Sequence, residues 1–137
     1  MATYDKIKMQ QWAQGIAASW WQKAFLIWPT IGAMPKVEMN SRLTSCGGRA
    51  FMLTPKNKLN FPDMVERVDF SCYLMERNPE EYRLETIPHE LSHFIAFRVY
   101  GEENHGKAFK FVMQKLGCRG TRCHRMETKR MAERKTK

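Results

Sequence analysis

Apolar residues recur at helical intervals over the first part of the chain, from about residue 5 to residue 28. The recurring positions are Ile7, Met9, Trp12, Ile16, Trp20, Phe25 and Leu26. Since an α-helix completes a turn in about 3.6 residues, this spacing predicts an amphipathic helix packed on the core. Trp20, Trp21 and Trp28 could alternatively form a platform for a substrate or a nucleobase, although aromatic residues at helical spacing more often serve packing.

Polar and apolar residues alternate over three stretches in the middle of the chain, as they do in strands. Residues 36–40 and 49–53 flank residues 45–48, whose paired glycines suit a tight turn, so these two strands are predicted to form a hairpin. Residues 67–73 predict a third strand. Residues 54–66 are polar and interrupted by two prolines, which predicts a connecting loop. The alternation therefore predicts a small three-stranded, mainly antiparallel sheet.

Helical signals dominate the second half of the chain. The segment Asn78-Pro79-Glu80-Glu81 combines a capping residue, a proline at the first position and carboxylates in the first turn, which predicts a helix start. Pro88 lies within the helical pattern that follows, so we expect a kink or a new helix start there, and Gly101 ends this helix. Residues 105–116 predict a last helix that stops at Gly117. Helices and strands together predict an α+β fold.

Length and composition fit one globular domain. The chain has 137 residues, of which 43% are hydrophobic, and this is enough for one core. We expect a single domain over residues 1–137, with a core from about residue 5 to residue 124 and a basic tail at 125–137. The formal charge of +9 favours polyanionic partners such as nucleic acid. Residues 118–137 carry eight Lys or Arg against two Glu, which suits either phosphate binding or a solvated terminus.

Four cysteines, Cys46, Cys72, Cys118 and Cys123, form no dense disulfide framework. The sequence shows no secretory signal and no apolar stretch long enough to span a membrane. We therefore expect free, mostly buried thiols, a reducing cytoplasmic location and no membrane partner.

The strongest chemical signal is the run Pro88-His89-Glu90-Leu91-Ser92-His93, an H-E-x-x-H motif within a helical pattern. Histidines four residues apart lie on the same helix face, so both imidazoles can reach one metal ion, with the glutamate beside it. This geometry is typical of zinc proteases. Catalytic zinc takes three protein ligands and keeps one position for water, so a third ligand must come from elsewhere. The candidate is His105, which follows a short polar turn.

Other metal ligands, and a purely structural role for the histidines, are alternatives to this interpretation. Glu102 and Glu103 could replace His105 as oxygen ligands, and Glu127 or Glu133 could supply a downstream carboxylate. The histidines could also be hydrogen-bonded core residues. Because three of the four histidines fall within seventeen residues, and polar rings on an apolar face are costly to bury without a partner, metal binding is the favoured interpretation.

From about Met34 to His124 the chain resembles the SprT family of zinc metalloproteases, relatives of the eukaryotic Spartan proteases. The matching segments are Asn40-Ser41-Arg42-Leu43 with the following glycines, Ile87 to His93, His105-Gly106-Lys107-Ala108-Phe109, Leu116-Gly117 and Cys123-His124. H-E-x-x-H is shared by many protease families, but the twelve-residue step from His93 to His105-Gly106-Lys107 makes the match specific.

The resemblance implies a zincin-like protease domain with His89, His93 and His105 as Zn²⁺ ligands and Glu90 as the general base. It also implies protein substrates and DNA as a partner, since Spartan-like members degrade proteins covalently trapped on DNA. Bacterial members typically carry a C-terminal zinc ribbon, which we expect this chain to lack. Cys118, Cys123 and His124 are too few for a ribbon, although a second zinc that also uses Cys46 is an alternative.

Three functions follow for testing. The first is a zinc endopeptidase that acts on DNA-associated or DNA-crosslinked proteins. The second is a zinc-containing module that binds nucleic acid or protein without proteolysis, and the third is a metallopeptidase with no nucleic-acid role. In either peptidase, a sheet edge beside the cleft could pair with an extended substrate backbone and give affinity with little side-chain selectivity.

Overall fold

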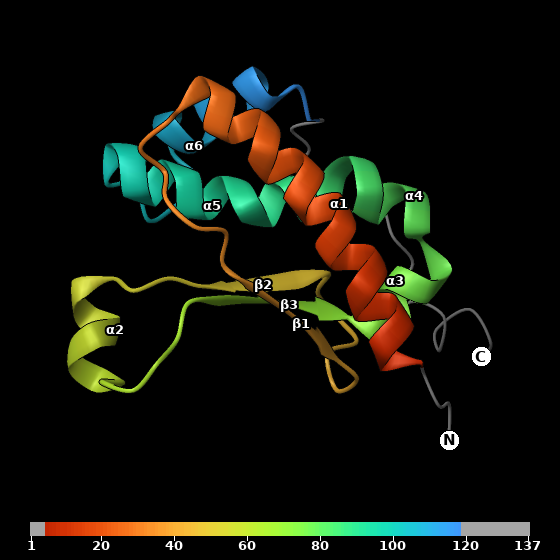
Figure 1. Cartoon of the computed structure of the whole chain (residues 1–137). Helices are drawn as coiled ribbons and strands as arrows, with labels where there is room; N and C mark the ends of the chain where they lie inside the picture. Colours follow the sequence, from red (N-terminus) through yellow and green to blue (C-terminus); the bar gives the residue numbers. More distant parts are fainter. Residues whose placement is uncertain (1–4, 119–137) are drawn as a thin grey trace.

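The computed structural model describes residues 5–118, in which helices cover one face of a small sheet (Figure 1). The helices are α1 (Lys6–Ile27), α2 (Pro55–Asn60), α3 (Cys72–Arg77), α4 (Pro79–Glu81), α5 (Ile87–Tyr100) and α6 (Lys107–Leu116), and a π-helical turn, η1 (Tyr82–Thr86), joins α4 to α5. The strands are β1 (Lys36–Asn40), β2 (Gly48–Phe51) and β3 (Arg67–Ser71). The predicted α+β class is confirmed.

The sheet is mixed, with the order β1-β3-β2. β3 pairs with β1 in parallel and with β2 antiparallel, so the predictions of a β1–β2 hairpin and of a mainly antiparallel sheet are wrong. The physical reason is that β3 is the most buried of the three strands, so its backbone N–H and C=O groups need hydrogen-bond partners at both of its edges. β2 consequently lies at an edge of the sheet, with one side of its backbone unpaired by β1 or β3.

The helix α1 packs on the core mainly through small residues, and of the predicted apolar stripe Met9, Ile16 and Trp20 are partly buried against the core. Its buried residues are Ala13, Ala17, Trp21 and Ala24, whereas Ile7, Phe25 and Leu26 are exposed. Alanines allow a close approach to α5, which α1 crosses in Figure 1. Trp21 and Trp28 are packing residues, as expected, and their indole N–H groups donate to the Gly32 carbonyl and the Tyr100 hydroxyl at 2.9 and 3.0 Å.

The irregularity predicted at Pro88 is present as η1, which directly precedes α5. Pro88 lies in the first turn of α5, where its missing N–H is tolerated, and the wider π-helical turn absorbs the change in backbone hydrogen bonding. Gly101 and Gly117 end α5 and α6 in the left-handed conformation, as predicted. The start of α6 differs from the prediction, because the helix begins at Lys107 and leaves His105 in the preceding loop.

The predicted loop at 54–66 contains the short helix α2. Thr54 caps it by accepting a hydrogen bond from the Asn57 N–H at 3.1 Å, and Pro55 occupies its first turn. This combination is a helix-start signal that the two prolines obscured.

Cys46, Cys72 and Cys118 are free thiols, as predicted, and the last two are buried. No helix within residues 5–118 is long and apolar enough to cross a membrane. Cys123, His124, Glu127, Glu133 and the basic tail at 125–137 lie outside the described residues.

Candidate metal centre

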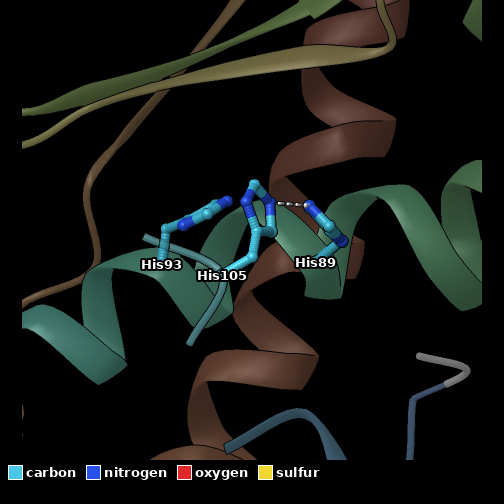
Figure 2. Close-up of side chains that lie close together, drawn as sticks. All are labelled: His89, His93 and His105. Atoms are coloured by element: carbon cyan, nitrogen blue, oxygen red, sulfur yellow. Dashed lines mark hydrogen bonds between the residues drawn. The ribbon is translucent and has the colours of Figure 1, made fainter. Parts of the chain in front are cut away.

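The helix α5 and the loop that follows it bring three histidines together (Figure 2). His89 and His93 project from successive turns of α5, and His105 returns from the loop that leads to α6. The Nε2 atoms of His89 and His105 lie 3.3 Å apart, and ligand atoms of all three residues lie within 4.8 Å of one another. The three predicted metal-binding residues therefore converge on one point.

The donor set and its spacing fit a zinc ion. Imidazole nitrogen binds zinc at about 2.0–2.1 Å, so two ligands at a tetrahedral angle lie about 3.4 Å apart. The His89–His105 separation of 3.3 Å matches this value, and His93 offers a ligand atom within 4.8 Å of those of the other two residues. Three histidines also leave the fourth position of a tetrahedral ion open.

Phe109 of α6 forms the floor beneath the three imidazoles. Its ring centroid lies 5.0 Å from that of His89, 4.4 Å from that of His93 and 4.8 Å from that of His105, and its plane stacks on the His93 ring. Because Phe109 is itself almost fully buried, it holds the histidine rings in a fixed orientation. The segment from His105 to Phe109 thus supplies both a candidate ligand and its support.

Burial determines the protonation states of His93 and Glu90. His93 is 9% exposed, and burial, with the charges of His89 and His105, lowers its pKa to about 3. The imidazole is therefore neutral near pH 7, which is the form that binds metal. Glu90 is 5% exposed, and burial raises the pKa of its carboxyl to about 7. A carboxyl with this proton affinity can both accept and release a proton near neutrality.

A cavity of about 500 Å³ opens beside the histidines. One wall is formed by residues 48–52, which include β2, and the other contains His89, Glu90, His93, Glu103 and His105. Gly48 packs directly on Glu90, since a Cβ at this position would lie 2.9 Å from Glu90 Cγ. The cavity thus places the motif glutamate and the histidines opposite the sheet edge.

The sequence pattern points to the three histidines and Glu90, but not to two further residues that lie against them in the structure. Phe109 belongs to the apolar pattern of the last helix, and its contact with His105, which lies in the loop before that helix, depends on tertiary packing. Gly48 was read as part of a turn, and its fit against Glu90 depends on tertiary packing. Of the alternative ligands, Glu103 lines the cavity and Glu102 lies against Gly106, but neither belongs to the histidine cluster.

A profile of the SprT-like family matches residues 21–130 of the chain. Protein SprT of Vibrio parahaemolyticus is 30% identical over 96 residues, which cover 69% of this chain and 51% of that protein. Protein SprT of Shigella boydii is 32% identical over 95 residues, covering 68% and 50%, and Protein SprT of Shewanella oneidensis is 35% identical over 51 residues, covering 36% and 33%. The matches thus span a third to a half of these relatives. No solved structure matches the chain.

Proposed function

Because this chain belongs to the SprT-like family, we propose that it is a zinc-dependent endopeptidase in which His89, His93 and His105 hold the metal and Glu90 is the general base. The convergence of three imidazoles and a buried glutamate in the lining of one cavity is the observation that carries this proposal. The donor set is that of catalytic zinc sites with an open position.

When held by His89, His93 and His105, zinc would acidify a water molecule and offset the negative charge that develops on a peptide carbonyl oxygen. Glu90 lines the same cavity as the histidines, so its carboxylate takes the proton of the attacking water. The same carboxyl then delivers that proton to the leaving amine. Its burial favours this transfer, because a poorly solvated carboxylate has a raised proton affinity.

The edge of β2 is the binding surface that we propose for the substrate backbone. Gly47 and Ser71 form a hydrogen-bonded pair, since the Ser71 N–H donates to the Gly47 carbonyl at 3.1 Å. In an antiparallel ladder such pairs alternate with residues whose backbone N–H and C=O groups point away from the partner strand. The backbone groups of Gly48 and Ala50 therefore point away from β3, toward the free edge of β2. An extended substrate chain adds there as a further strand, and this mode accepts varied sequences.

Proteins associated with DNA, or crosslinked to it, are the substrates that we propose. The formal charge of the chain is +9, of which residues 118–137 contribute +6. Such a concentration of positive charge attracts a polyanion and raises the local concentration of proteins bound to it. The same charge also favours the second candidate, a zinc-containing module that binds nucleic acid without proteolysis.

The test compares Glu90→Gln with the unmodified chain, both loaded with zinc. The probe is a protein crosslinked to single-stranded DNA, offered beside the same protein without DNA. We expect Glu90→Gln to keep one zinc per chain and to lose about 10²- to 10⁴-fold in turnover, because it cannot carry the proton. Glu103→Gln is the matched control, since Glu103 lines the same cavity without a place in the mechanism.

Equal turnover by Glu90→Gln and the unmodified chain would refute the assignment of the general base. If a zinc-loaded sample cleaves neither probe but binds DNA in a salt-sensitive way, the binding module is the correct function. Cleavage that is unaffected by DNA, with no DNA binding, identifies a peptidase without a nucleic-acid role.

A further inference from the structure

A second cavity, of about 570 Å³, lies at the end of β2, between the sheet and the segment that follows α2. Phe51 and Arg67 form its sheet wall, and residues 60–64 form the other. Phe51 and Arg67 are paired across β2 and β3, one position beyond the pair of Ala50 and the fully buried Val68. Since neighbouring residues of a strand face opposite ways, Phe51 and Arg67 lie on the face away from the core.

The apolar residues of the cavity lining are Phe51, Phe61, Pro62 and Met64, and the segment around Phe61 is exposed. Phe61 is 59% exposed, and Leu59 and Val65, on either side of it in the chain, are 82% and 64% exposed. Single exposed apolar residues are common, but an exposed ring in a cavity lining, with exposed apolar neighbours in the chain, favours the binding of an apolar partner.

The charges in the cavity do not favour an anionic ligand. Arg67 donates to Asp69 Oδ1 at 3.0 Å, and its guanidinium lies 4.2 Å from the centre of the Phe51 ring. The other charged residue of the lining is the acidic Asp63. Because the arginine is already paired and stacked, it stiffens the sheet wall and offers little charge to a phosphate.

Phe51 also lines the cavity at the metal centre, so the two cavities meet at this residue. A chain added along the β2 edge has side chains that point alternately to the two faces of the sheet. The residue beside Ala50 then faces the histidines, and the residue beside Phe51 faces the second cavity. One extended peptide therefore reaches both cavities with successive side chains.

We propose that this second cavity, formed by Phe51, Arg67 and residues 60–64, is a substrate subsite that takes a bulky apolar side chain of an extended polypeptide lying along β2. The inference rests on the proposed peptidase function and gives it a preference for unfolded segments, since large apolar residues are accessible mainly there. The backbone of the substrate pairs with the strand, and the subsite fixes which peptide bond lies at the metal centre.

The test uses two twelve-residue peptides of Gly, Ala and Ser, one of which has a single central Leu in place of Ser. Phe61→Ser removes an exposed ring of the subsite, and Leu26→Ser removes a side chain that is 79% exposed on α1 and lines neither cavity. We expect Phe61→Ser to lower kcat/KM about tenfold for the Leu peptide and to leave the Ser peptide unchanged. We expect Leu26→Ser to leave kcat/KM unchanged for both peptides. Mass spectrometry should locate the cleaved bond of the Leu peptide at a fixed number of residues from Leu.

Peptide binding by zinc-loaded Glu90→Gln, measured by fluorescence anisotropy, separates the subsite from catalysis. The subsite predicts tighter binding of the Leu peptide, lost when Phe61→Ser is added. If the chain cleaves with dependence on Glu90 but Phe61→Ser affects both peptides equally or neither, the subsite is refuted and the peptidase stands. If the chain cleaves neither peptide but binds the Leu peptide selectively, the peptidase function is refuted and the apolar binding site stands. If it neither cleaves nor selectively binds the Leu peptide, both the peptidase function and the subsite are refuted.

Discussion

Gly48→Ala tests the fit between the sheet edge and the general base. The added Cβ would lie 2.9 Å from Glu90 Cγ, 3.1 Å from Phe70 Cδ1 and 3.2 Å from the Asp69 carbonyl oxygen. Gly48 does not have a positive φ, so the effect of alanine is steric. Phe70 is fully buried and the Asp69 carbonyl belongs to the central strand. Glu90 is therefore the group that moves.

The size of the effect follows from these contacts. Carbon atoms in good contact are about 3.5 Å apart or more, so the Glu90 side chain is displaced by about 0.6 Å. A misplacement of about 1 Å costs about 10²-fold in rate, and half of that displacement costs about tenfold. Overpacking of this kind also lowers the free energy of unfolding by about 1–3 kcal/mol.

The assay measures kcat on an unfolded protein, zinc content and urea unfolding for Gly48→Ala. Gly15→Ala is the matched control, since Gly15 lies in α1 with no atom within 4 Å of an added Cβ. This control keeps full activity and gains about 0.5–1 kcal/mol of stability from helix propensity. Gly48→Ala with unchanged kcat and unchanged stability would contradict the proposed packing of β2 on Glu90.

Two further substitutions test residues that support the candidate metal centre, one beneath the histidines and one at the turn before β2. Phe109→Ala removes the floor under three imidazoles, so we expect it to lower the free energy of unfolding by about 3–5 kcal/mol and to weaken zinc binding, measured by urea unfolding and chelator competition. Undiminished zinc affinity would argue against that support. Tyr82→Phe removes the hydroxyl that donates to the Gly47 carbonyl at 2.6 Å, but Ser71 N–H still donates to that carbonyl. We therefore expect Tyr82→Phe to lower the free energy of unfolding, measured in urea, by only about 0.5–1.5 kcal/mol. A decrease above about 3 kcal/mol would contradict the assignment of Ser71 as a second donor to Gly47.

Local signals in the sequence specify the ends of the helices well. Gly101 and Gly117 stop α5 and α6 because glycine enters the left-handed conformation without strain. Pro88 marks the irregular entry to α5 because it lacks an N–H. The i, i+4 spacing of His89 and His93 in turn places both rings on one helix face.

The order of the strands and the packing of α1 were not predictable in the same way. Alternation indicates which face of a strand is buried but not which strand is central. β3 lies between β1 and β2 because it is the most buried strand, and its backbone N–H and C=O groups need hydrogen-bond partners at both edges. In α1 the buried face consists largely of alanines, which an apolar pattern of large residues overlooks. Gly48 and Phe109 acquire their place at the metal centre from the same tertiary packing.

The most direct test of the central claim is the zinc affinity of the whole chain beside that of His105→Ala, with Asn104→Ala as the control from the same exposed loop. We predict one zinc per chain for the unmodified protein and for Asn104→Ala, because the three imidazoles converge on one ion. Loss of a partner outside the ligand set costs about 10- to 100-fold in affinity, so loss of the His105 ligand costs at least about 100-fold. Equal zinc affinity for His105→Ala and the unmodified chain would contradict the three-histidine centre.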